Sequence, residues 1–151
     1  METNNKALQP SNLLAEYKTI MPIHVQWGDQ DAAQHVNNAM YLRYAETARI
    51  AYFHELGYKM DLENKVAPIL AEINIQYKMP VTFPDTLWAG TRTIGIPDEF
   101  TILMETILVS EKMQRIAAKI VARIVNYDYS ALKKAPTPAD FLDKLRLLDS
   151  I

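Results

Sequence analysis

Residues 39–56 read AMYLRYAETARIAYFHEL and decide the fold. The stretch contains neither Gly nor Pro, consists largely of good helix formers and stops at Gly57, so it predicts one α-helix. Arg43, Glu46 and Arg49 fall on one narrow stripe, and apolar or aromatic residues cover most of the remaining surface. We therefore expect a largely buried helix, around which the rest of the chain must wrap.

The segments on either side of this helix are typical of β-strands. Residues 17–27, before it, are rich in β-formers. After it, alternation of apolar and polar residues predicts a half-buried strand over 69–77, and short turns separate further strands at 86–94, 100–109 and 115–127. This order predicts an α+β domain in which an antiparallel sheet of about five strands curves around one long central helix.

Two further expectations concern side-chain faces and the last helix. In the final strand, the packed face should carry Ile116, Ala118, Ile120, Ala122 and Ile124, with the opposite face in water. A turn is expected at 96–99. Near the end of the chain, Thr137 before Pro138 predicts the start of a short helix whose buried residues are Phe141, Leu145 and Leu148.

Length and composition bound the organisation of the chain. At 151 residues and 17.3 kDa we expect one domain over 13–151, preceded by a flexible polar arm over 1–12. A formal charge of -2 with scattered cations argues against nucleic-acid binding, and no apolar run is long enough to span a membrane. The absence of Cys excludes thiolate metal sites and permits a cytoplasmic location, which is the expectation.

The polar loop before the helix, WGDQDAAQHVNN over residues 27–38, is the best candidate for chemistry. A helix N-terminus presents unpaired N–H groups and a partial positive charge, so the amides near Asn38 can stabilise charge on an oxygen. Asp31 lies one short loop upstream and can act as a nucleophile or as a general base. The two together predict an acyl-transfer site.

Structural roles for the same residues remain open. Asn38 can simply be the N-cap, and Asp29 and Asp31 can bind loop N–H groups. His35 can have a packing role. The stripe of Arg43, Glu46 and Arg49 is most simply an exposed or interface line of salt bridges, although Glu46 can activate water if it faces the pocket. The histidines stand at 24, 35 and 54, too dispersed to predict a metal site, so we expect neither metal nor organic cofactor.

Two stretches carry a resemblance to a known family. The string VQWGDQDAAQHVNNAMYLRYAETARIAYFHELG, residues 25–57, strongly resembles the N-terminal signature of hotdog-fold acyl-CoA thioesterases of the 4-hydroxybenzoyl-CoA thioesterase type. The segment INIQYKMPVTFPDTLWAGTRTIGI, residues 73–96, is similar to that family's strand, proline turn and strand. The likeness extends over roughly residues 17–140, and it implies a hotdog fold.

The resemblance implies specific roles for the loop residues. The family's catalytic aspartate falls on Asp31, with Asp29 in support, and its carbonyl-polarising amide falls on Asn38. It further implies that the substrate pocket lies between the subunits of a homodimer or homotetramer, with coenzyme A on the outer surface. The expected partner is an acyl-CoA, and an acyl carrier protein thioester is the secondary expectation.

Other positions of the pattern are supporting or divergent. His35, assigned to the catalytic group, and Asn37 match polar positions that line or brace the loop, and we assign Tyr41 and Glu46 to supporting or substrate-binding roles. Gln34 stands where the family commonly has Gly, directly before the histidine. If that position requires a positive φ, Gln is strained there.

The resulting hypothesis is hydrolysis of an acyl-CoA to a free acid and coenzyme A. A hotdog enoyl-CoA hydratase or dehydratase is the second candidate, since Asp31 and His35 could move protons at an acyl β-carbon; a crotonyl-CoA hydration assay separates it from thiol release. A non-catalytic acyl-CoA binding module is the third candidate, and binding without turnover would identify it.

Overall fold

The computed structural model describes residues 10, 12–58, 63 and 65–151. The elements in chain order are β1 (Thr19–His24), a 3-10 turn η1 (Trp27–Asp29), α1 (Met40–Glu55), β2 (Val66–Tyr77), β3 (Thr86–Asp98), β4 (Thr101–Ser110), β5 (Arg115–Asp128), β6 (Lys133–Lys134) and α2 (Ala139–Asp149). In this part of the chain, no helix is both long and apolar enough to cross a membrane.

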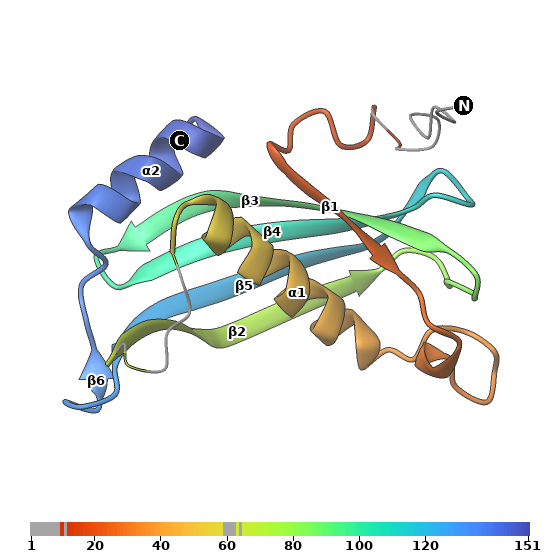
Figure 1. Cartoon of the computed structure of the whole chain (residues 1–151), viewed down its shortest axis with the longest axis horizontal. Coiled ribbons are helices and arrows are strands. Elements are labelled where there is room, and N and C mark those ends of the chain that lie inside the picture. The colour runs from red at the N-terminus through yellow and green to blue at the C-terminus, as the bar shows by residue number, and fades with distance from the viewer. Residues whose placement is uncertain (1–9, 11, 59–62, 64) are drawn as a thin grey trace.

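The strands form one antiparallel sheet in the order β1-β3-β4-β5-β2, and β6 pairs with the end of β5. β1 and β2 therefore lie at opposite edges, although they are consecutive strands in the chain. Five strands about 4.8 Å apart give a sheet about 19 Å wide, and a 16-residue helix is about 24 Å long. α1 is thus long enough to cross the whole sheet, as Figure 1 shows.

The predicted helix is confirmed, with each end within one residue of the expected position. Its buried side consists of aromatic residues and alanines: Tyr41, Tyr44, Ala45, Ala48, Tyr52 and Phe53. The exposed side is broader than expected, because Leu42 as well as Arg43 and Glu46 lies in solvent. α1 is therefore packed on the sheet along one face and open along the other.

The sheet side of α1 holds two core clusters. The first surrounds Tyr44 and Ala48 and includes Leu87 and Leu108 from the sheet. The second surrounds Tyr52 and Phe53 and takes in α2 through Leu145, with Phe141 and Leu148 packed against it, as predicted. These two clusters hold α1 along its whole length.

The start of α2 differs by one residue from its prediction. Pro138, in extended conformation, occupies the N-cap, and its carbonyl accepts the N–H of Leu142 at 3.0 Å. Thr137 precedes the cap, and its N–H donates to the carbonyl of Glu99 at 2.8 Å. No side chain caps this helix.

Among the strand boundaries that differ from expectation, the ends of β1 and β3 are set by turns. β1 ends at His24 because residues 26–29 close a tight turn, in which Asp29 Oδ2 accepts the N–H of Gln26 at 2.8 Å. β3 continues to Asp98 instead of turning at 96–99. Asp98 Oδ1 accepts the N–H of Phe100 at 2.8 Å, so the turn forms at 99–100 and Asp98 still pairs with Thr101.

The prediction for Ile116 is wrong. Leu108 pairs with Ala118 and Val109 pairs with Ile116, so Ala117 is an extra residue in β5. A bulge of this kind interrupts the alternation of faces. Ile116 consequently packs on the outer face of the sheet, and Ala117 joins the inner core; the other four residues of the expected face are buried there as predicted.

The outer face of the sheet is not simply wet, because the segment before β1 covers part of it. Leu14 and Tyr17 pack there with Ile107 and Val109. Pro10 is buried as well, while residues 1–9 and 11 of the expected arm lie outside the described residues. The outer face thus has a small apolar core of its own.

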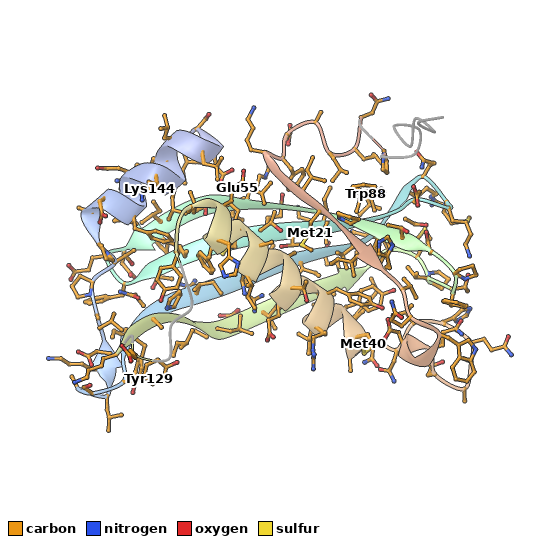
Figure 2. All side chains as sticks on the ribbon, viewed as in Figure 1. Met21, Met40, Glu55, Trp88, Tyr129 and Lys144 are labelled. Atoms are coloured by element: carbon orange, nitrogen blue, oxygen red, sulfur yellow. The ribbon has the colours of Figure 1, made fainter. Side chains whose placement is uncertain are left out.

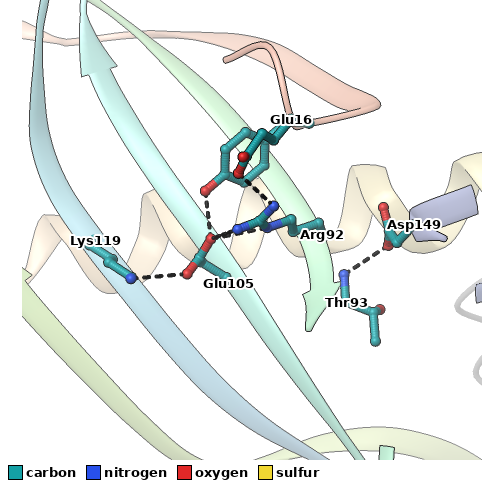
Figure 3. Close-up of polar contacts among 7 residues, drawn as sticks. Glu16, Arg92, Thr93, Glu105, Lys119 and Asp149 are labelled. Atoms are coloured by element: carbon teal, nitrogen blue, oxygen red, sulfur yellow. Dashed lines mark hydrogen bonds and ion pairs between the residues drawn. The ribbon is translucent and has the colours of Figure 1, made fainter. Parts of the chain in front are cut away.

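A charged cluster lies beside this outer core (Figure 3). Glu105, 5% exposed, accepts a hydrogen bond from the Tyr17 hydroxyl at 2.6 Å and pairs with Arg92 at 3.0 Å and Lys119 at 3.2 Å. Burial alone would raise the pKa of the Glu105 carboxyl, but these hydrogen bonds and cations outweigh it and leave the pKa below its ordinary value. Arg92 also pairs with Glu16 at 3.0 Å, which ties the segment before β1 to the sheet.

Gly90 is the position on β3 that lets this segment lie close to the sheet. A Cβ at Gly90 would stand 2.7 Å from Tyr17 Cγ and 2.8 Å from Leu14 Cδ2. We predict that Gly90→Ala lowers the free energy of unfolding by about 1–3 kcal/mol, the usual cost of overpacking. Urea denaturation measures this difference.

The matched control is Gly28→Ala, because a Cβ at Gly28 meets nothing within 4 Å. This variant should stay within about 0.5 kcal/mol of the wild type. Equal stability of both variants would contradict the close packing of the segment on β3.

Candidate active site

The loop over residues 25–39 is held by its own backbone and by the segment that follows β2. The N–H of Asp31 donates to the carbonyl of His35 at 2.9 Å, and the N–H of Gln34 donates to the carbonyl of Asp31 at 3.0 Å. Val36 donates to the carbonyl of Val81 at 2.8 Å. The loop is therefore a tight turn fixed against residues 81–83, beside the start of α1 that Met40 marks in Figure 2.

Asp29 braces this loop from behind. Its Oδ2 accepts the Tyr44 hydroxyl at 2.6 Å as well as the N–H of Gln26, and its carbonyl accepts the N–H of Asn37 at 2.8 Å. Tyr44 is buried in α1, and burial together with the Asp29 hydrogen bond raises the pKa of its phenol above the ordinary value. Asp29 thus connects the loop to the helix and does not line the groove described below.

The helix start is organised by Asn37, and Asn38 is not the N-cap. Ala39 occupies the N-cap position, and Asn37 Oδ1 accepts its N–H at 2.9 Å. The carbonyl of Asn38 accepts the Tyr77 hydroxyl at 3.0 Å, whereas its N–H has no acceptor within the described residues. This free amide is the kind of donor that the sequence predicts at the opening of α1.

A surface groove of about 530 Å³ lies where the loop, the helix start and the end of β2 meet. Four predicted residues line it together: Asp31, His35, Asn38 and Tyr41. Asp31 Oδ1 accepts the N–H of Ala33 at 2.8 Å, and Oδ2 has no partner in the described part of the chain. One carboxylate oxygen is therefore available to a bound molecule.

Glu46 does not belong to this arrangement. It lies about two turns further along α1 and lines a different cavity, with Arg49. Asn37 also stays out of the groove lining, since its side chain is engaged with the helix start. Both residues are thus separate from the groove, one by distance along the helix and one by its hydrogen bond.

Sequence reasoning missed the other wall of the groove, which consists of Tyr77, Lys78, Met79 and Pro80. Tyr77 contacts Tyr41 edge to face, with ring centroids 4.9 Å apart. Burial raises the pKa of the Tyr41 phenol, and the nearby Tyr77 raises it further. The sequence signal that could have indicated this wall is an aromatic residue and a cation, Tyr77 and Lys78, at the end of an alternating strand just before the Pro80 turn.

The chemical capacity of the groove follows from these groups. The free N–H of Asn38, at the positive end of the α1 dipole, can polarise a carbonyl oxygen. The Asp31 carboxylate lines the same groove and can attack that carbonyl carbon or take a proton from water. Among the described residues, no group of three or more His, Asp or Glu side chains could hold a metal ion.

Gln34 has φ 62°, in the left-handed region. The family that this sequence resembles commonly has Gly at this position. The loop therefore has a left-handed backbone at a residue, Gln, for which that conformation is strained. The side chain of Gln34 is exposed. Side-chain packing therefore does not account for Gln in place of Gly, and nothing else in the structure explains it.

Comparison with known proteins identifies the family. The profile of the thioesterase-like superfamily matches residues 25–145, which include the loop, α1 and the whole sheet except β1. The chain belongs to this superfamily and is a thioester hydrolase. A comparison with curated proteins finds no match.

Solved structures share the fold of this chain. A thioesterase from Thermus thermophilus, complexed with coenzyme A and Zn, is 27% identical, with a TM-score of 0.78 over 90% of this chain and 97% of that one. The PA5185 protein from Pseudomonas aeruginosa is 24% identical (TM-score 0.80; 89% and 94% covered), and the DHNA-CoA thioesterase from Staphylococcus aureus is 16% identical (TM-score 0.79; 87% and 91%). The predicted hotdog fold is confirmed.

The strain at Gln34 leads to a prediction. Replacing Gln34 by Gly removes the left-handed strain of about 1–2 kcal/mol, while the extra freedom of Gly in the unfolded chain offsets part of it. Gln34→Gly should therefore be more stable than Gln34→Ala by about 0.5–1 kcal/mol in urea denaturation. A Gly variant no more stable than the Ala variant would show that this backbone is not left-handed in solution.

Proposed function

We propose that the protein is an acyl-CoA thioesterase, which hydrolyses the thioester of an acyl-CoA to a free acid and coenzyme A. Membership of the thioesterase-like superfamily and the coenzyme A bound to the Thermus relative support this substrate class. The observation that carries the proposal is the shared groove: it is lined both by Asp31, which has one carboxylate oxygen without a partner among the described residues, and by Asn38, which has a free N–H.

In the proposed reaction, the thioester carbonyl oxygen accepts the N–H of Asn38. Asp31 either takes a proton from a water that adds to the carbonyl carbon, or adds itself to give an anhydride that water then hydrolyses. In both routes the negative charge on the former carbonyl oxygen is stabilised by the helix start, the carbon–sulfur bond breaks, and the thiolate leaves. The departing thiolate takes up the proton that the water gives up, so that water and thioester give one acid and one thiol. The proposed steps use neither a metal nor an organic cofactor.

We also propose that the working unit is a homodimer or homotetramer. β2 is an edge strand of 12 residues, and apolar side chains along it are exposed, with Leu70 at 43% and Tyr77 at 51%. Exposed apolar surface beside an unpaired strand edge is typical of a subunit contact. Because Tyr77 also lines the groove, a second copy at this edge would enclose the substrate.

Hydration of an enoyl-CoA remains the second candidate, favoured by the presence of His35 in the same groove as Asp31. That reaction adds water across a carbon–carbon double bond and releases no thiol. Crotonyl-CoA therefore separates the two functions, since loss of its ultraviolet absorbance without free thiol would indicate hydration. The proposed thioesterase should release thiol from saturated acyl-CoAs.

The decisive variant is Asp31→Asn. The amide oxygen can still accept the N–H of Ala33, so the loop should keep its shape while the reactive charge is lost. We predict that kcat for thiol release falls about 10²–10⁴-fold, the usual contribution of a general acid or base, with little change in melting temperature.

The control for this assay is Asp143→Asn, which alters an exposed carboxylate on α2 and should leave kcat unchanged. Wild-type activity should also survive dialysis against EDTA. Full activity of Asp31→Asn would contradict the proposed mechanism.

A further inference from the structure

A second cavity, of about 280 Å³, lies between α1 and β2 and shares no lining residue with the Asp31 groove. Its walls are mostly apolar: Ile50 and Phe53 from α1, Ile69 and Leu70 from β2, and Ile124 from β5. Arg49, from α1, lines the same space. The cavity thus combines an apolar interior with one guanidinium group.

Arg49 is half-buried and has no carboxylate within 4.0 Å among the described residues. The other half-buried arginines, Arg92 and Arg123, both have carboxylate partners, at 3.0 Å and 3.7 Å. Burial lowers the pKa of the Arg49 guanidinium, and the nearby charge of Glu46 offsets part of this effect. A cation removed from water without a partner is unfavourable, so an anion in the cavity would relieve that cost.

A smaller cavity of about 40 Å³ adjoins the first, and both are lined by Pro68 and Ile124. The Tyr58 hydroxyl lines it and, within the described residues, is buried without a hydrogen-bond partner. The rings of Phe53, Tyr58 and Phe141 contact one another here, with centroids about 6 Å apart. The chain therefore leaves unfilled apolar space beyond the Arg49 cavity.

We propose that this cavity binds the carboxylate of a small organic acid with an apolar body. A guanidinium matches a carboxylate with two parallel hydrogen bonds, and the apolar body would lie against Ile50, Phe53 and Ile69. The volume is just below the range of about 300–1,000 Å³ that holds drug-sized ligands, so an acid of about ten non-hydrogen atoms is appropriate. Glu46 also lines the cavity, but its side chain is exposed and its charge can remain in water.

This site goes beyond the hydrolysis proposed at Asp31, and its ligand chemistry has two natural sources. One is the free acid that a thioesterase releases. The other is the far end of an acyl group that carries a second carboxylate. Both present an apolar chain ending in a carboxylate, which is the chemistry that Arg49 selects.

The first test is calorimetric titration of the full chain with octanoate and with 1-octanol, which has the same length but no charge. We expect octanoate to bind at least tenfold more tightly than octanol. Arg49→Gln should lose this preference, whereas Arg49→Lys should retain part of it. The matched control is Arg43→Gln, which alters an exposed arginine of the same helix that does not line the cavity and should bind octanoate as the wild type does.

Equal binding of octanoate and octanol by the wild type, undetectable binding of octanoate, or unchanged preference in Arg49→Gln would overturn the proposal. Circular dichroism of each variant checks that the fold is retained, and Arg49→Lys serves if Arg49→Gln does not fold. Sedimentation tests the competing occupant, a carboxylate of a second copy. Weaker self-association of Arg49→Gln with unchanged octanoate binding would assign Arg49 to a subunit contact and contradict the acid site.

A second assay distinguishes the two sources of carboxylate and rests on the proposed thioesterase activity. Suberyl-CoA and octanoyl-CoA differ only in a terminal carboxylate. If Arg49→Gln lowers kcat/KM for suberyl-CoA at least tenfold and leaves octanoyl-CoA unaffected, the acyl group supplies the carboxylate. If Arg49→Gln changes kcat/KM equally for both substrates, and octanoate binding still requires Arg49, the released free acid supplies the carboxylate. Absence of any hydrolysis would refute the proposed function alone, because octanoate binding is measured without turnover.

Discussion

α1 connects the two opposite edges of the sheet, and the core and the groove are both arranged around it. β1 and β2 are consecutive strands at opposite edges of one sheet, so the segment between them has to cross the whole face. A helix of 16 residues crosses it and at the same time satisfies its own backbone hydrogen bonds in the interior. Tyr44, Ala48 and Tyr52 then fill the space under the helix, and the sheet curves around them.

The same crossing determines where chemistry can occur. Because α1 begins over one end of the sheet, Asn38, which directly precedes the helix and has a free N–H, lines one groove with the loop and the last residue of β2. Asp29 holds this loop to Tyr44, a buried residue of the helix, so the loop cannot shift independently of the core. Asp31 thereby stands beside the helix start with one oxygen unoccupied. Further along, the side of α1 that faces β2 leaves room for the separate Arg49 cavity.

Much of the fold and of the site could be predicted from the sequence, because the apolar periodicity of a long segment indicates which of its faces is buried. The helix over 39–56, the strand that contains Ile73 and Ile75, and the loop with Asp31 and Asn38 all followed from local patterns and from the resemblance. Features that depend on pairing between distant segments could not be predicted. The extra residue at Ala117 changes the face of Ile116 only because β4 opposes it with one residue fewer. Likewise, Tyr77 joins the groove only through the register that brings the end of β2 to the helix start.

The central claim is that a thioester carbonyl bound in the groove is polarised by the opening turn of α1. Isotope-edited infrared spectroscopy of a ¹³C-labelled acyl-CoA bound to the inactive Asp31→Asn protein measures this polarisation directly. We predict a carbonyl stretch at lower wavenumber than that of the same thioester free in water. A stretch at equal or higher wavenumber would mean that the groove polarises the carbonyl no more strongly than water does, and it would contradict the assignment of this groove as the active site.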